Sequence, residues 1–163
     1  MKRSVLFLIA LTVVSTPLFA AFKTANLSVT ASVAANCTIA TAPVAFGAYD
    51  PVGVNAAADL LATGTVTVAC TKGAPTTIDL GNGTNFLAGT RRMGSGTDFM
   101  NYALYKDAAR TQVWGTGLAG GTTVAYTAAT VAATAITAYG TVPMAQNVSP
   151  GAYSDTVVAT INY

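Results

Sequence analysis

Few side chains in this sequence could carry out acid, base or nucleophilic chemistry. All six acidic residues are Asp, and the 163 residues include neither His nor Glu, which excludes His-assisted nucleophiles, His-bound zinc and Glu general acids. Two Asp pairs, Asp98 with Asp107 and Asp50 with Asp59, are the candidates for hydrolysis by paired carboxylates. They lie near Gly, Pro or Ala, however, where Asp usually caps a turn. We therefore predict that the protein is not an enzyme and has no catalytic residue, metal or cofactor.

The N-terminus has the pattern of a secretory signal peptide. Lys2 and Arg3 precede an apolar run over residues 5–14, and small residues suitable for cleavage follow next to Ala20. The run is shorter than the roughly 20 residues that a membrane-spanning helix needs. Residues 1–20 are therefore predicted to be removed on export. Their loss would leave six basic and six acidic residues, so the mature chain would be formally neutral.

The two cysteines, Cys37 and Cys70, are predicted to form a structural disulfide. An exported protein with two cysteines is expected to join them. A redox or metal-binding pair would need a C-x-x-C spacing or His partners, and the sequence has neither. Closing a loop of this length would stabilise the fold by roughly 3–4 kcal/mol in the chain-entropy model.

The composition favours β-structure. Thr occurs 26 times and charged residues make up only 9% of the chain, and this mixture favours short strands and tight turns over helices. Strands are expected at residues 44–46, 63–71, 76–80, 101–106, 122–127, 136–143 and 153–163. Gly-rich turns separate them, which is typical of an all-β sandwich or barrel in one domain. The net charge of +2 is too small to indicate a nucleic-acid partner.

Both ends of the predicted mature chain alternate between apolar and polar residues. In residues 24–33 every odd position is apolar, namely Ala25, Leu27, Val29, Ala31 and Val33. The last strand places Val157, Ala159, Ile161 and Tyr163 on one face, with Tyr153 and Asp155 at its entrance. This period is typical of strands with one buried face. The N-terminal strand lies outside the disulfide loop, so it could pair within its own sandwich or with another chain.

Several short motifs resemble those of the spore coat protein U domain. The first, VAFGAYDP at residues 44–51, is similar to the FG-x-YDP opening of that family. The others are GTVTVACT at 64–71, RM at 92–93, YALYKD at 102–107, VWG at 113–115, YGTVP at 139–143 and GAYSDTV at 151–157. Each motif alone is weak, but their order and spacing over residues 37–163 make a specific match. The family includes the subunits of archaic (Csu-type) chaperone–usher pili.

The resemblance implies an incomplete immunoglobulin-like β-sandwich that lacks its final strand and exposes a hydrophobic groove. It implies that residues 37–163 are the pilin domain, with the disulfide between early strands. Residues 21–36 would be a donor-strand extension. In such pili a periplasmic chaperone fills the groove first, and at an outer-membrane usher the extension of the next subunit replaces it. The C-terminal strand and its terminal carboxylate would dock onto the chaperone. The expected function is that of a structural subunit of an extracellular fibre, a head-to-tail polymer of homologous subunits.

Other interpretations stay open on the residues alone. The protein could belong to a spore or cyst coat, or be a self-contained carbohydrate-binding module with Trp114, Tyr102 and Tyr105 as a sugar platform. Core or groove-wall packing is favoured for these aromatics. A small outer-membrane barrel is disfavoured because the chain has a single Trp and a disulfide pair. A donor segment favours a shaft or adaptor subunit over a tip adhesin. Arg91 and Arg92 are expected in a solvated loop.

Overall fold

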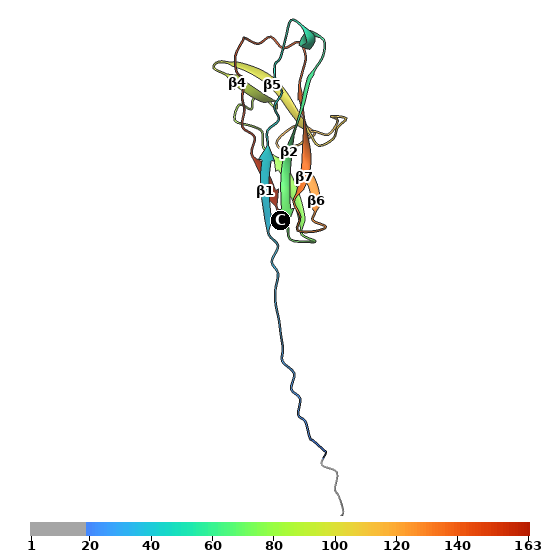
Figure 1. Ribbon diagram of the computed structural model, residues 1–163. Helices are drawn as coiled ribbons and strands as arrows, with labels where there is room; N and C mark the ends of the chain where they lie inside the picture. Colours follow the sequence, from blue (N-terminus) through green and yellow to red (C-terminus); the bar gives the residue numbers. More distant parts are fainter. Residues whose placement is uncertain (1–18) are drawn as a thin grey trace, which may run out of the picture. The chain divides into compact units, whose positions relative to one another are not determined.

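The computed structural model describes residues 19–163. The predicted signal peptide lies outside the described residues, except for its last two positions. By its internal contacts the chain divides into residues 1–32 and residues 33–163. In the first unit, residues 19–32 have no assigned helix or strand (Figure 1). Their side chains are exposed. No helix among residues 19–163 is long and apolar enough to cross a membrane.

Two antiparallel sheets form the second unit (Figure 1). One sheet has five strands in the order β1-β2-β7-β5-β4, and the other has three in the order β6-β3-β8. The strands are β1 Cys37–Ala42, β2 Leu60–Cys70, β3 Pro75–Leu80, β4 Arg91–Ser95, β5 Asp98–Tyr105, β6 Val124–Thr127, β7 Thr134–Val142 and β8 Ala159–Asn162. A short 3-10 helix, Val54–Ala56, precedes β2. The prediction of an all-β fold is confirmed.

Alternating side chains on the facing strands build the core between the sheets. In β2 every second residue from Gly64 to Cys70 is buried. Trp114 follows β5 and is fully buried. Its indole Nε1 donates to the Ile78 carbonyl of β3 at 3.0 Å, and its amide donates to the Leu104 carbonyl of β5 at 2.9 Å. Trp114 therefore ties the three-stranded sheet to the five-stranded sheet through the core.

The strand predictions are confirmed for β2, β3, β5, β6 and β7, with small differences in their ends. The last strand is shorter than predicted: β8 pairs with β3 only opposite residues 77–80, so residues 153–158 have no such ladder. The prediction of a strand at residues 44–46 is wrong. Two strands were not predicted. β1 is an edge strand with one mostly exposed face, and β4 contains two Arg and a Gly, so neither has a clear period of two.

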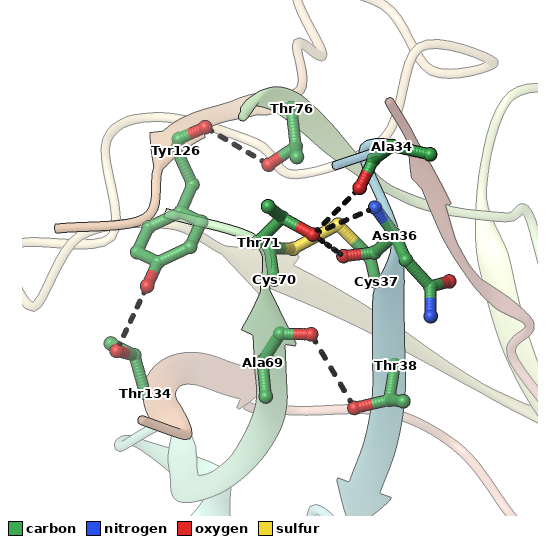
Figure 2. The surroundings of a disulfide bond; sticks show 10 residues. All are labelled: Ala34, Asn36, Cys37, Thr38, Ala69, Cys70, Thr71, Thr76, Tyr126 and Thr134. Carbon is green, nitrogen blue, oxygen red and sulfur yellow. Dashed lines mark hydrogen bonds between the residues drawn. A yellow bond between two sulfur atoms is a disulfide. The ribbon is translucent and has the colours of Figure 1, made fainter. Parts of the chain in front are cut away.

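The disulfide joins Cys37 and Cys70, as predicted. The two residues face each other in the β1–β2 register, with their Cα atoms 4.1 Å apart. Figure 2 shows the bond at the end of the sandwich where β1 begins and β2 ends. Cys70 also packs with Ala74 and Ala128 in a small buried cluster. This end of the domain is therefore held by both a covalent bond and apolar contacts.

Candidate strand-binding groove

Two sheet edges lie next to each other on one side of the sandwich. β1 is the outer strand of the five-stranded sheet, and β8 is an outer strand of the three-stranded sheet. They lie close together, yet within residues 19–163 no ladder joins them. The free side of an outer strand presents backbone N–H and C=O groups that can pair with a further strand. The sandwich is therefore open between β1 and β8.

An apolar groove, called here the edge groove, lies at this opening. Two cavities of about 470 and 640 Å³ share Val44, Phe46 and Tyr153 in their walls, so they adjoin as two sections of one groove. One wall is the chain at residues 41–51, and the other is the chain at residues 148–159. The floor consists of core side chains, namely Leu60, Val66, Leu80, Met100, Tyr102, Leu104 and Ala138. The hydrophobic core thus opens directly into the groove.

The first wall is anchored by Tyr49 and Asp50 of the VAFGAYDP run. The Tyr49 hydroxyl donates to the Pro143 carbonyl and accepts from the Gln146 amide, both at 2.9 Å. The Asp50 carboxylate accepts from the Gly53 amide at 2.8 Å and so closes the following turn. These bonds attach the wall to the end of β7 and give the FG-x-YDP motif a structural role.

Val44 and Phe46 explain why this wall is not a strand. Their side chains pack against the core, and the Phe46 ring meets the Tyr102 ring edge-on at a centroid distance of 6.3 Å. A β-carbon at Gly64 would lie 2.7 Å from Val44 Cγ2, and one at Gly140 would lie 2.7 Å from Phe46 Cζ. The two glycines leave room for the wall to cross the inner face of the sheet, where no partner strand is available.

The second wall is attached to the hairpin of β4 and β5. The Asp98 carboxylate accepts from the Ser149 amide at 2.6 Å and from the Tyr153 hydroxyl at 3.0 Å. These hydrogen bonds, that of Ser149 foremost, lower the pKa of the Asp98 carboxyl. Ser154 and Gly94 exchange two backbone hydrogen bonds, of 2.8 and 3.1 Å. The chain leading into β8 is thus fixed beside the groove at its start.

Asp155 is the charged residue of this wall, and its carboxylate is well coordinated. It accepts from the Tyr102 hydroxyl at 2.6 Å, the Thr84 hydroxyl at 2.6 Å and the Asn85 amide at 3.2 Å. Burial would raise the pKa of the Asp155 carboxyl, but the hydrogen bonds outweigh burial and hold the pKa below its usual value. Burial, followed by the Asp155 hydrogen bond, raises the pKa of Tyr102. Gly83, at φ +87°, admits the carboxylate, because a β-carbon there would overlap Asp155.

We predict that this carboxylate makes the domain sensitive to acid. Because the pKa of Asp155 is lower in the folded chain than in the unfolded chain, its ionised form stabilises the fold above the unfolded value of about 3.9. That stabilisation is lost as the pH falls through the folded-state pKa. Asp155→Asn should therefore lower the Tm at pH 7 and reduce the fall in Tm below about pH 4. Thermal unfolding by circular dichroism at several pH values tests this, and parallel Tm profiles of the two chains would contradict it.

The expectation of a solvated loop at Arg91 and Arg92 is wrong. Arg91 is 1% exposed, and its Nη2 donates to the carbonyls of Leu80 at 2.7 Å and Gly81 at 2.6 Å. Burial lowers the pKa of Arg91, although nearby Tyr102, Asp79 and Asp155 act to raise it. Arg92 lies over the Phe99 ring at 4.2 Å. The Arg91 guanidinium therefore supplies the donors for two backbone carbonyls at the end of β3. No local sequence pattern indicates this role.

The aromatic residues weighed as a sugar platform are mainly core residues. Trp114 is fully buried and Tyr102 is 6% exposed, while Tyr105 is half-buried on the next face of β5. Tyr102 also lines the edge groove. The preference for core or groove-wall packing is confirmed for Trp114 and Tyr102. Neither ring is exposed enough to stack against a sugar.

The Asp residues weighed for hydrolysis hold backbone amides. Asp107 accepts from the amides of Thr111 at 3.1 Å and Gln112 at 2.8 Å, and Asp59 accepts from the Met144 amide at 2.9 Å. Together with Asp50 and Asp98, they close turns or join loops to strands. Within residues 19–163, no three of the His, Cys, Asp and Glu side chains gather where they could hold a metal ion.

The predicted site residues fall into two groups. Val157 and Ala159 line the edge groove, Ile161 packs near the disulfide cluster, and Tyr163 is 59% exposed. The alternating segment of residues 24–33 has exposed side chains throughout, with Leu27 and Val29 at 88% and 85%. The structure thus places Val157 and Ala159, but not Ile161 or Tyr163, at the groove, and the N-terminal residues form an exposed apolar row.

Sequence reasoning missed the residues that shape the groove. The sequence patterns place Val44, Phe46 and Tyr153 only in strands or motifs, and they place Arg91 in solvent. The VAFGAYDP and GAYSDTV motifs were the available signal, because each supplies one wall.

The fold is similar to a chain in the crystal structure of the CsuC–CsuE chaperone–tip adhesion subunit pre-assembly complex from archaic chaperone–usher Csu pili of Acinetobacter baumannii. The TM-score is 0.56 at 22% sequence identity, and the match covers 80% of this chain but only 40% of that chain. The predicted fold of an incomplete immunoglobulin-like β-sandwich agrees with this similarity and with the open edges of β1 and β8.

The sequence comparisons agree with the motif resemblance. Protein U of Myxococcus xanthus is 40% identical over 161 residues, covering 90% of this chain and 88% of that protein. The family model of the Spore Coat Protein U domain matches residues 23–160, which include the alternating N-terminal segment. On this evidence, the chain belongs to the Spore Coat Protein U domain family.

Proposed function

We propose that this protein is a subunit of a surface fibre that polymerises by donor-strand exchange. Each edge groove would accept residues 24–33 of a neighbouring subunit, while the subunit's own N-terminal segment enters the next groove. Such a head-to-tail contact does not close on itself, so it generates a filament. The observation that carries the proposal is the pairing of an open apolar groove with an exposed segment of alternating apolar residues.

The dimensions of the two elements support this pairing. The donor segment, residues 24–33, and the groove wall with β8, residues 153–162, each have ten residues, and a ten-residue strand spans about 33 Å. The donor segment contains no charged residue, which suits a groove floored by core side chains. Burying Leu27, Val29 and Val33 would contribute about 1.5–3 kcal/mol each. A backbone ladder along β8 would add its hydrogen bonds, so the subunits should separate very slowly.

The proposal includes export and assembly partners. Removal of the predicted signal peptide in the periplasm would leave the donor segment near the new N-terminus. An open groove exposes apolar surface and a sheet edge, which promotes aggregation, so a periplasmic chaperone would cover it until an outer-membrane usher brings the next donor strand. The residues of the groove edge, Val157, Ala159, Ile161 and Tyr163, would contact the chaperone first. The expected location is the extracellular surface.

The test is the assembly state of the exported protein on unheated SDS gels, with and without residues 22–34. The full chain should give a ladder of multimers that disappears on deletion. Moving residues 22–34 behind Tyr163 through a short glycine-rich linker should give a soluble monomer, because a hairpin-linked strand can fill its own groove antiparallel to β8. Stable, soluble monomers from both the full and the shortened chain would overturn the proposal.

A structural protein of a spore or cyst coat is the second candidate function. The 40% identity to Protein U and the family match support it. Donor-strand exchange could serve a coat as well as a fibre, so the assembly gel does not separate the two. Immunogold electron microscopy does: label on thin filaments indicates a pilus, and label on a continuous surface layer indicates a coat.

A further inference from the structure

The hydroxyl of Thr71 holds the first residues of the second unit, just before β1 (Figure 2). Thr71 follows β2 and the disulfide residue Cys70. Its Oγ1 accepts from the Asn36 amide at 3.1 Å and lies 3.2 Å from the Ala34 carbonyl, to which it donates. The Thr71 amide donates to the Asn36 carbonyl at 2.9 Å. One side chain therefore holds residues 34–36, which precede the first strand.

The hydroxyl is needed because the backbone of Thr71 is already used. In an antiparallel ladder, the Asn36 amide would donate to the carbonyl of the residue opposite. That carbonyl instead accepts from the Ala74 amide at 3.0 Å and closes a turn. The Gly73 amide of the same turn donates to the Ala128 carbonyl at 2.8 Å, which fixes the turn to the loop after β6. The Asn36 amide thus donates to the Thr71 hydroxyl in place of the Thr71 carbonyl.

We propose that Thr71 sets the place where one subunit can bend against the next. The inference rests on the proposed function, in which the donor strand ends at Val33. The residues held by Thr71 begin at Ala34. The proposed donor strand, which ends at Val33, is therefore followed directly by residues fixed to the sandwich of the same subunit, without a flexible linker. Thr71 is in this sense a positioning residue for assembly: without its hydroxyl, residues 34 and 35 would become a flexible linker, and Asn36 would keep only the hydrogen bond from the Thr71 amide to its carbonyl.

Residue-resolved hydrogen–deuterium exchange on the exported full chain tests whether the Thr71 hydroxyl holds residues 34–36, whatever the state of assembly. Thr71→Val keeps the shape of the side chain and removes the hydroxyl, so the Asn36 amide should exchange roughly tenfold faster. Thr71→Ser should retain slow exchange. Thr38→Val is the matched control, because Thr38 lies on the same strand pair and, within residues 19–163, its hydroxyl makes a single long hydrogen bond, to the Ala69 carbonyl at 3.5 Å. Unchanged exchange in Thr71→Val, or equal acceleration in Thr38→Val, would overturn the inference.

Electron microscopy of fibres gives the second readout. Thr71→Val fibres should show a wider distribution of angles between consecutive subunits than wild-type or Thr38→Val fibres. Equal angle distributions would overturn the role in bending. If the wild-type chain forms no fibres, the proposed function fails, while the exchange experiment still decides whether Thr71 fixes residues 34–36. Protected amides in the β2–β7 ladder serve as the check that every variant is folded.

Discussion

Val29→Asp is expected to abolish the SDS-resistant ladder of this protein. Val29 lies in the middle of the apolar row of residues 24–33 and is 85% exposed in the single chain. In the proposed fibre it would be buried in the groove of the neighbouring subunit. The substitution removes about 1.5–3 kcal/mol of burial and places a carboxylate in an apolar site, where an unpaired charge costs several kcal/mol more. Since the Val29 side chain is exposed and lies outside the unit of residues 33–163, the fold of that unit should not change.

The matched control for Val29→Asp is Ser28→Asp, which adds the same charge to the opposite face of the same segment. Because successive side chains of a strand point to opposite faces, Asp at position 28 would remain in water and the ladder should persist. Unheated SDS gels and negative-stain images of both variants make the comparison. A ladder that survives Val29→Asp would mean that this residue does not enter a groove. Equal loss in both variants would mean that added charge, and not the apolar face, governs assembly.

Trp114→Ala is expected to lower the free energy of unfolding by about 3–5 kcal/mol, as large core truncations do. The side chain is fully buried, and its Nε1 donates to the Ile78 carbonyl of the facing sheet. The substitution would leave both a cavity between the sheets and a buried carbonyl without its partner. Such a loss is a large fraction of the stability of a single domain, so we also expect lower yield of the exported protein.

Trp114→Phe separates the two contributions in that prediction. It keeps a ring in the core but removes the indole N–H, so it should cost about 1–3 kcal/mol. Urea unfolding followed by circular dichroism gives both values, with the donor segment moved behind Tyr163 so that assembly does not interfere. Tyr105→Phe, at a half-buried position on the neighbouring strand, should stay near the wild-type value. A loss below 1 kcal/mol in Trp114→Ala would show that the two sheets do not depend on this residue.

Much of the fold could be predicted from local patterns. In β2, β3 and β7, apolar or small residues recur at every second position on the face that the structure buries, because a strand between two layers must bury one face. The disulfide of Cys37 and Cys70 followed from export and from the count of cysteines. The order of short motifs from VAFGAYDP to GAYSDTV indicated the family. These features depend on residues close together in the chain, or on composition alone.

The groove could be expected from the family resemblance, but its construction is decided only by the tertiary structure. Its two walls, residues 41–51 and 148–159, are about a hundred positions apart in the sequence. They lie next to each other because β1 is an outer strand of one sheet and β8 is an outer strand of the other. Residues 44–46 have a strand-like composition, yet they cross the inner face of the sheet over two glycines.

Arg91 and Thr71 show the same limit of sequence reasoning. A charged pair in a Gly-rich region indicates solvent, but Arg91 is buried because the carbonyls of Leu80 and Gly81 need a donor after β3 ends. Thr71 is one of 26 Thr residues, and its hydroxyl matters only because a turn has taken its carbonyl. The sequence by itself determined which residues alternate, which cysteines pair and which family they indicate. The tertiary structure alone decided which backbone groups were left without partners and which side chains satisfied them, because that depends on where distant strands end.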